Sequence, residues 1–424
     1  MSDENPIVRY VIHPGIGVAR VGNSPDEYFI GPEAPGEVPQ PEGGFKDSAG
    51  RIKRQAARFR IYELNNAGEA IREITADDAE ITWRVHVANR KAAWYQFENA
   101  MDLGKFAKTT ALRNKSITGA DRQKLIIDPG PRTISGRNIQ GDPYHFNTGK
   151  FMGTEVPLGE LRTDDAGRLI FLGGFGHSAS ADNKPAITFA NNDGWHDDTS
   201  DGPVRATVKI DGQEFEAEPA MVAVTPPSYG QGLYGVVTMY DVVFDLFSRD
   251  PKFGKSRRPS FWRDIFPIFE RLVDNQWVNS GVSFLFGSGS PSDLTDPELL
   301  YKLSSPAEEH KPLRTSYFNW FRNPADATGP QEPEKLPPFY GDAFGDYNDL
   351  GMDDLPVTPT QYEWLRNWAD GDFDSDPSHR ERPATLDAYS LAEQPHALDY
   401  PQPFHLGTGE AFEYHPLPFL GVLG

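Results

Sequence analysis

Residues 205–227 are RATVKIDGQEFEAEPAMVAVTPP, two runs of alternating apolar and polar residues on either side of Asp211-Gly212. A period of two places every second side chain on the same face of a strand. The Asp-Gly dipeptide favours the tight two-residue turn that joins antiparallel strands. The stretch therefore predicts a β-hairpin, and it is the strongest hairpin pattern in the chain.

Similar alternation runs through the preceding sequence. Residues 57–64 (ARFRIYEL) and 70–74 (AIREI) flank the turn sequence NNAG, which predicts a second hairpin. Residues 168–176 (RLIFLGGFG) predict a short buried strand. Residues 80–89 (EITWRVHVAN) place four apolar side chains on one face of a strand: Ile81, Trp83, Val85 and Val87. The first half of the chain is thus predicted to be mostly β.

Helical spacing replaces this alternation from about Val236. The runs VVTMYDVVFDLFSRD and FWRDIFPIFERLVDNQW carry apolar residues at helical intervals. Residues 359–373 (PTQYEWLRNWADGDF) predict another helix, which Thr360 caps and Gly371 ends. Its buried face carries Tyr362, Leu365 and Trp368. The Pro- and Asp-rich tract 323–356 predicts ordered irregular structure, with a linker as the alternative.

These patterns predict an α+β fold. A β-rich N-terminal domain covers residues 1–245, and a helical and irregular region over residues 246–424 packs on it. A chain of 424 residues is long enough for two domains or one large domain with insertions.

Composition narrows the function. The net charge of −21 repels phosphate backbones and anionic membranes, so we expect no nucleic-acid or membrane partner. The N-terminus lacks a signal-peptide pattern and no window has the length of a membrane span, which predicts a soluble, cytoplasmic protein. The absence of cysteine excludes disulfides, thiolate metal sites and cysteine nucleophiles in this chain.

One acidic stretch, residues 190–204 (ANNDGWHDDTSDGPV), is a candidate for chemistry. Its aspartates do not follow the spacing of a calcium-binding EF-hand loop, so we predict no metal. Residues 192–194 and 201–203 instead predict structured turns, because Asn and Asp bond to nearby backbone. The ring of Trp195 beside His196 indicates that the stretch covers a pocket or docks on the core.

Two other motifs resemble known sites only loosely. FGHSAS contains His177 and Ser178 after a buried strand, but it lacks the G-x-S-x-G pattern of a hydrolase. HPGIGVARVGNS has Arg20 where a dinucleotide site needs its third glycine, so we predict a structural turn there. Four histidines are expected to pair within the fold: His13, His86, His145 and His405.

Four long motifs occur in the order found in one family. HPGIGVARVGNSPDEYFIGPE, GELRTDDAGRLIFLGGFGHSAS, ANNDGWHDDTSDGPVRATVKIDGQEFEAEPAMVAVTPPSY and TPTQYEWLRNWADGDF resemble the quinoprotein amino-acid oxidases typified by L-lysine ε-oxidase and glycine oxidase. The resemblance implies oxidative deamination of an amino acid or amine, with release of peroxide and ammonia. It also implies a cysteine tryptophylquinone, which is built from a Cys and a Trp beyond the fourth motif.

This chain departs from the family where the quinone should lie. It has no Cys and no Trp beyond Trp368, so neither half of the cofactor is present, and the C-terminal region is shortened relative to the family. Apolar and aromatic residues near the end are expected to cover apolar surface and favour a natural terminus: Phe404, Phe412, Tyr414, Phe419 and Leu420.

Three explanations remain open. A second polypeptide carrying the Cys and Trp could complete a split oxidase, in which case a large exposed apolar patch should mark where it docks. The chain could instead be a non-catalytic paralogue that serves in binding or assembly, with its cleft filled by its own side chains. A cofactorless or metal-dependent activity could also occupy the old cleft. The sequence leaves open whether the chain is itself an enzyme, and we expect an oligomer.

The candidate site follows from the same stretch. If the chain takes part in oxidation, Asp197 or Asp198 is the predicted general base and His196 is a further catalytic candidate. A carboxylate suits this role if burial or a neighbour raises its pKa. The predicted substrate-binding residues are Trp195, His177, Tyr229 and Tyr234.

Overall fold

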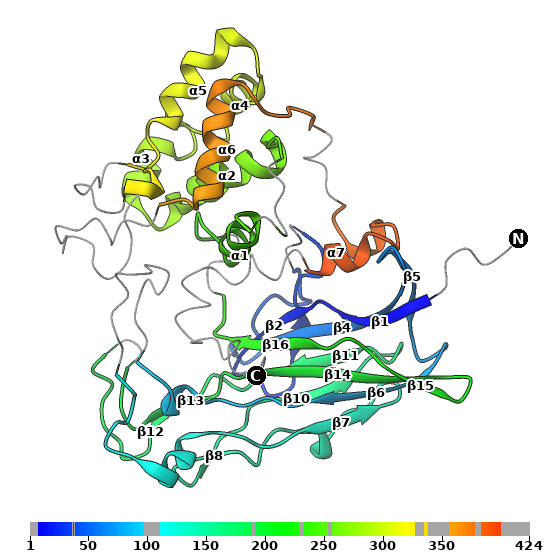
Figure 1. Cartoon of the computed structure of the whole chain (residues 1–424). Helices are drawn as coiled ribbons and strands as arrows, with labels where there is room; N and C mark the ends of the chain where they lie inside the picture. The colour runs from blue at the N-terminus through cyan, green and yellow to red at the C-terminus, as the bar shows by residue number, and fades with distance from the viewer. Residues whose placement is uncertain are drawn as a thin grey trace, which may run out of the picture.

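A strongly curved sheet and a group of helices make up the molecule (Figure 1). The computed structural model describes residues 7–35, 37, 39–96, 111–188, 191–228, 233–250, 252, 257–326, 335–337, 356–377 and 383–399. Helices α1 to α6 lie together above the sheet, and α7 lies on the sheet itself. The predicted α+β fold, with a β-rich N-terminal region and a helical C-terminal part, is confirmed.

The strands are β1 Ile7–His13, β2 Ile16–Arg20, β3 Tyr28–Ile30, β4 Arg54–Asn65, β5 Ala70–Ile74, β6 Glu80–Val85, β7 Arg132–Ser135, β8 Lys150–Phe151, β9 Thr154–Glu155, β10 Glu160–Thr163, β11 Leu169–Leu172, β12 Ser178–Ser180, β13 Trp195–Asp197, β14 Asp201–Ile210, β15 Gln213–Glu216 and β16 Ala220–Thr225. Twelve of them form one sheet, whose main path runs β10-β11-β4-β2-β16-β14-β6-β7. Its two ends meet where the Thr163 amide donates to the Ile139 carbonyl at 3.0 Å, so the sheet is nearly a closed barrel.

The predicted hairpins are confirmed. β14 and β15 pair antiparallel, with Ile210 opposite Gln213. Asp211 and Gly212 between them have φ angles of 50° and 80°, which Asp tolerates and Gly adopts freely. β4 and β5 pair in the same way across the NNAG turn.

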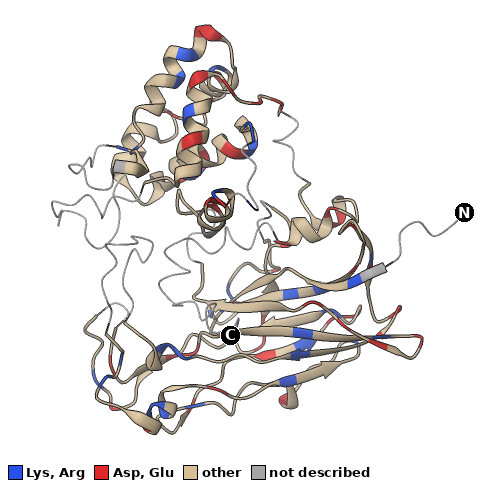
Figure 2. Ribbon diagram, in the orientation of Figure 1, with Lys and Arg blue, Asp and Glu red and all other residues tan. Residues whose placement is uncertain are grey.

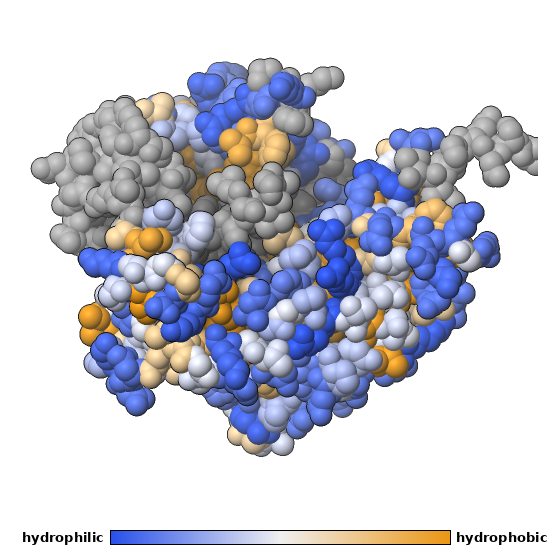
Figure 3. Space-filling model, turned by 60° about the horizontal axis from the view of Figure 1, so that its bottom comes forward, coloured by the Kyte–Doolittle hydropathy of each residue, from blue (hydrophilic) through white to orange (hydrophobic). Residues whose placement is uncertain are grey.

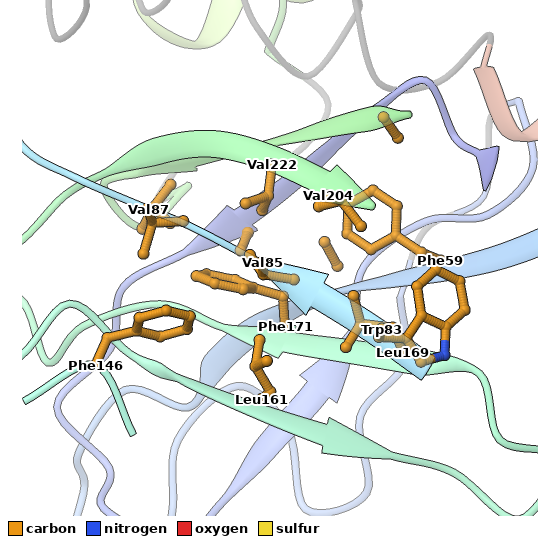
Figure 4. Packing of buried hydrophobic residues seen from close by; sticks show 14 of the residues in the cluster. Phe59, Trp83, Val85, Val87, Phe146, Leu161, Leu169, Phe171, Val204 and Val222 are labelled. Atoms are coloured by element: carbon orange, nitrogen blue, oxygen red, sulfur yellow. The ribbon is translucent and has the colours of Figure 1, made fainter. Parts of the chain in front are cut away.

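One hydrophobic core fills the curved sheet (Figure 4). The predicted inward face of residues 80–89 is confirmed, because Ile81, Trp83, Val85 and Val87 are all buried. Trp83 satisfies its single polar atom by donating from Nε1 to the Gly167 carbonyl at 2.9 Å. The other side chains labelled in the figure come from strands and loops all round the sheet: Phe59, Phe146, Leu161, Leu169, Phe171, Val204 and Val222.

The helices are α1 Met239–Ser248, α2 Phe266–Asp274, α3 Ser280–Phe286, α4 Pro297–Ser304, α5 Lys311–Phe318, α6 Pro359–Asp370 and α7 Gln394–Asp399. A π-helical turn, η5 Phe261–Ile265, precedes α2, and the 3-10 turn η6 Asn275–Trp277 follows it. A second hydrophobic core joins α2, α4, α5 and α6, in which the Phe269 and Trp368 rings meet edge to face at 5.2 Å.

The predicted cap of α6 was wrong by two residues. Thr358 caps the helix: its hydroxyl accepts from the Gln361 amide, and the Gln361 side chain accepts from the Thr358 amide. Pro359 takes the first helical position, where its fixed φ angle and missing N–H carry no cost, so the helix begins before Thr360. The Thr360 hydroxyl instead donates to Asp245 of α1 at 2.7 Å. Gly371 ends the helix with a φ of 89°, as predicted.

After the helices the chain returns to the sheet. Leu386 and Leu398 pack against Tyr62 and Leu64 of β4, and the Tyr62 hydroxyl donates to Gln394 of α7 at 3.0 Å. This contact packs the C-terminal region on the β-rich region, as predicted. The division near residue 245 stays a prediction. The aromatic tail from Phe404 to Leu420 and most of tract 323–356 lie outside the described residues.

The surface carries charges of both signs. Figure 2 shows acidic and basic residues interspersed over the sheet and the helices. On the face turned forward in Figure 3, apolar residues form small patches among hydrophilic ones. Of the described helices, none has both the length and the apolar character needed to cross a bilayer.

The carboxyl group of Asp274, at the end of α2, predicts a pH-dependent stability. Burial, together with the nearby Glu270, raises its pKa from 3.8 to about 6. The fold therefore favours the protonated acid, and stability falls as the pH rises from the unfolded-state pKa through 6. We expect Asp274→Asn to raise the Tm by a few degrees at about pH 7.5 and to leave it unchanged near pH 4.

Scanning calorimetry at both pH values checks this expectation. Glu363→Gln, on the exposed side of α6, removes the same charge from the surface and serves as the matched control. An equal gain for both variants, or a gain that persists near pH 4, would contradict the assignment to Asp274.

Candidate functional site

The two motifs that suggested chemistry meet in one small ribbon. β12 and β13 pair antiparallel, with Ala179 opposite His196 and Ser178 opposite Asp197. His177 stands immediately before this ribbon and Asp198 immediately after it. The Ser178 hydroxyl donates to the His196 carbonyl at 3.0 Å, so it stabilises the ribbon.

A buried asparagine holds the turn that leads into β13. The Asn114 amide donates to Asp193 Oδ1 and the Gly194 amide donates to Asn114 Oδ1, both at 2.6 Å. Arg113 donates to the Asn192 carbonyl at 2.9 Å. The turn predicted at residues 192–194 is confirmed, and Gly194 has a φ of 79°.

The second predicted turn, residues 201–203, was wrong. These residues begin strand β14, where Asp201 pairs with Ala223 of β16 and the Pro203 carbonyl accepts from the His86 amide at 3.2 Å. Gly202 is required by packing, because a Cβ there would lie 1.9 Å from the His86 carbonyl oxygen. Local turn preference gives way here to the hydrogen bonds of the sheet.

Asp197 is the hub of a polar cluster. Its Oδ2 lies 2.5 Å from Lys91 Nζ, and its Oδ1 accepts from the Thr199 hydroxyl at 2.7 Å and from Asn89 Nδ2 at 3.0 Å. Burial alone would raise the pKa of this carboxyl, but the Lys91 ammonium and the Thr199 hydrogen bonds lower it below its ordinary value. Asp197 is therefore a stable anion that fixes β13 to the segment after β6.

Asp198 has the opposite environment. Its side chain is buried beneath the loop that follows β11, and its Oδ2 accepts from the Phe175 amide at 2.7 Å. Burial raises the pKa of Asp198, and the amides of His177 and Phe175 only partly oppose this shift. Gly174 permits the approach, because a Cβ there would lie 2.6 Å from Oδ2. Of the two neighbouring carboxyls, Asp198 is the one that holds a proton more readily.

Trp195 and His196 carry polar atoms that lack partners. Trp195 Nε1 and His196 Nδ1 are both buried, and neither has a hydrogen-bond partner within the described part of the chain. The His196 ring lies against Phe151 at 5.1 Å, and burial lowers its pKa, so the imidazole is neutral near pH 7. They are two of ten buried side-chain N/O atoms without a partner in the described residues, and both lie on this ribbon.

Tyr234, one of the two predicted tyrosines, is held through its backbone near the helical region. The Tyr234 carbonyl accepts from Asn275 Nδ2 at 3.3 Å, at the end of α2. Tyr229 lies outside the described residues. The structure therefore brings together His177, Trp195, His196, Asp197 and Asp198, and their predicted roles stay predictions.

Three of the four histidines that were expected to pair within the fold do so. His13 lies 3.0 Å from Asp399, His86 lies 2.7 Å from Asp128, and His145 lies 3.2 Å from Glu160. His405 lies outside the described residues. Over the residues that the structure describes, no three His, Asp or Glu side chains are grouped to hold a metal.

Arg54 anchors the loop that covers Asp198. Its guanidinium is fully buried, and Nη2 lies 2.7 Å from Glu160 Oε1. Nη1 donates to the Gly173 carbonyl at 3.3 Å, and the guanidinium carbon lies 4.7 Å from the centre of the Phe175 ring. The loop of residues 173–177 is thereby tied to β4. Sequence patterns gave no indication of this role, because Arg54 and Gly173 are 119 positions apart.

A solved amino-acid oxidase shares this fold. The chain superposes on the crystal structure of the L-Lys ε-oxidase from Marinomonas mediterranea with a TM-score of 0.68 and 26% identity, over 92% of this chain and 64% of that chain. A structure described as the Schiff base intermediate of that enzyme with L-Lys gives a TM-score of 0.67 at the same identity and coverage. The architecture is that of an amino-acid oxidase.

Sequence comparison identifies the family. The family model described as L-Lysine epsilon oxidase N-terminal matches residues 13–224, and the L-lysine epsilon oxidase C-terminal domain matches residues 341–413. The L-lysine 6-oxidase of Marinomonas mediterranea is 31% identical over 451 residues, which cover 90% of this chain and 60% of that protein. The chain belongs to the L-lysine ε-oxidase family, as its motifs predicted, and spans about 60% of this relative's length.

The quinone implied by the family resemblance does not fit on this chain. A thioether to tryptophan requires a cysteine sulfur, and none of the 424 residues supplies one. The described residues therefore provide framework and polar groups, and no reaction step is assigned to a quinone here.

The pKa values of Asp197 and Asp198 should lie on opposite sides of 3.8, the ordinary value for an aspartate. We expect Asp198 to titrate above this value because it is buried, and Asp197 below it because it is paired with Lys91. Carbon-13 NMR of carboxyl-labelled aspartate, assigned with Asp197→Asn and Asp198→Asn, measures both. The reverse order would contradict the environments described above.

Removal of the Arg54 charge should destabilise the fold strongly. Arg54→Met removes one partner of Glu160, which keeps Arg162 at 3.2 Å, and we expect a loss of about 1.5–3 kcal/mol in the free energy of unfolding. Arg9→Met breaks an exposed pair with Glu218 and should cost about 1 kcal/mol or less. Urea denaturation measures both, and hydrogen exchange should show faster opening of residues 173–177 only in Arg54→Met.

Proposed function

We propose that this chain forms the scaffold and the substrate-facing part of an amino-acid oxidase whose redox centre lies on a Cys- and Trp-bearing polypeptide segment outside these 424 residues. One observation carries the proposal: the chain matches an L-lysine 6-oxidase over 90% of its own length, and it has no cysteine. The substrate class is a primary amine of an amino acid, by analogy with the relative that was captured with L-Lys.

Within this proposal the two aspartates have different tasks. Asp198 takes up a proton from the substrate, because its raised pKa makes its carboxylate a stronger base than an ordinary one. Asp197 positions the ribbon, because Lys91, Thr199 and Asn89 already occupy its oxygens. This division favours one of the two bases that the sequence left open.

The aromatic and neutral groups of the ribbon suit the substrate. Trp195 and His196 offer a ring surface and two polar atoms without partners, and a neutral imidazole does not repel a substrate ammonium. The net charge of −21 also attracts a cationic amino acid from solution.

A second candidate is a non-catalytic paralogue that binds a ligand or a partner. The engagement of Asp197 in a structural ion pair favours it, because one of the two predicted bases already serves to hold the ribbon in place. The absence of cysteine fits this candidate equally.

Activity measurements separate the two candidates. The purified chain alone should show no visible quinone absorbance and should release no peroxide with a panel of amino acids. Co-expression with the portion of L-lysine 6-oxidase that this chain does not match should restore peroxide release. In that complex, Asp198→Asn should lower kcat about 100-fold or more, whereas Asp197→Asn should act mainly on stability.

Each other outcome has a definite meaning. A covalent quinone in the isolated chain would contradict the proposal. A complex that forms and binds L-lysine by calorimetry, but releases no peroxide, would favour the non-catalytic paralogue. Equal loss of kcat in the Asp197 and Asp198 variants would remove the special role of Asp198.

A further inference from the structure

Bulky apolar side chains crowd one end of the helical region. Trp277 is 76% exposed and Phe284 is 81% exposed, and Val278 and Leu285 beside them are also more than half exposed. All four belong to η6, α3 and the short segment between them. We call these four residues the α3 face.

Helix α3 is apolar on its opposite side as well. Val282 and Phe286 are buried in the helical core, where Phe286 meets Trp320 edge to face at 5.3 Å. Four of its seven residues are bulky and apolar, and two of these, Phe284 and Leu285, are exposed. In the described structure α3 is covered on one side only.

The sequence around this face is free of charge. Residues 275–292 contain no Asp, Glu, Lys or Arg, although charged residues make up 24% of the chain. Charged residues are depleted at the centre of protein interfaces. The sheet differs, because its surface in Figure 3 shows apolar residues only as small patches among hydrophilic ones.

We propose that the α3 face docks the polypeptide that supplies the remainder of the family fold. This inference rests on the proposed function and names the surface at which the missing segment binds. The matched region covers only 60–64% of the relatives, so over a third of their length has no counterpart in this chain. An uncharged, aromatic face suits a surface that the longer relatives bury within one molecule.

A second copy of this chain fits the α3 face less well. Each copy carries a net charge of −21, so pairing two copies would bring like charges together. The α3 face offers the missing family segment aromatic anchors of the kind that dominate binding energy at interfaces.

Binding measurements with matched variants test the assignment. The probe is the portion of L-lysine 6-oxidase that this chain does not match, labelled with a fluorophore and titrated by anisotropy. Phe284→Ser and Trp277→Ser should each weaken its binding about tenfold or more. Ile71→Ser is the matched control, because Ile71 is 40% exposed and lies on β5, away from both the α3 face and the β12–β13 ribbon (Figure 1); its affinity should equal that of the wild-type chain.

Further measurements test the docking surface independently of the proposed function. The Tm of each variant should match or exceed the wild-type value, because exposed apolar groups are removed. Binding that is unaffected by both α3-face variants would overturn the docking surface and leave the proposed function intact. No binding and no peroxide with the wild-type chain would count against the proposed function itself. A dimer of the chain alone that Phe284→Ser dissolves would replace this inference with self-association.

Discussion

A guanidinium that is buried away from water requires a carboxylate within the protein to balance its charge. Arg54 does so through Glu160, and the rest of its donors then organise the backbone around it. It joins the start of the longest strand, β4, to the loop after β11 by way of the Gly173 carbonyl and the Phe175 ring. The Phe175 amide in that loop in turn donates a hydrogen bond to Asp198. The candidate site therefore depends on one buried ion pair in the wall of the sheet.

Burial and nearby charge likewise give two neighbouring carboxyls different pKa values. Asp197 and Asp198 are adjacent in sequence, yet Asp197 ends β13 and Asp198 lies in the bend after it, so the two side chains have different surroundings. The carboxyl of Asp197 contacts the Lys91 ammonium, the Thr199 hydroxyl and the Asn89 amide, so it stays ionised. Asp198 meets buried backbone, and its charge is disfavoured. The surroundings of each carboxyl therefore decide whether it stays ionised or can carry a proton.

Local sequence patterns predicted the elements that local physics decides. Asp211-Gly212 specified its hairpin because few residues adopt positive φ angles, and the period of two in residues 80–89 located the inward face. Contacts between distant residues were beyond such patterns. Asn89 and Asp197 are 108 positions apart, and nothing in either segment identifies the other. The composition of residues 201–203 predicts a turn, but pairing within the sheet decides their structure. The family came from long ordered motifs, not from periodicity.

The return of the chain to the sheet constrains how the helices can move. The helical region leaves the sheet after β16 and comes back through residues 383–399, where Asp399 accepts from the Gly15 amide at 2.7 Å and contacts His13. A body held by two separate tethers on one platform loses most of its freedom to swivel. The helical region is therefore anchored at two separate points of the sheet and cannot turn about a single connection.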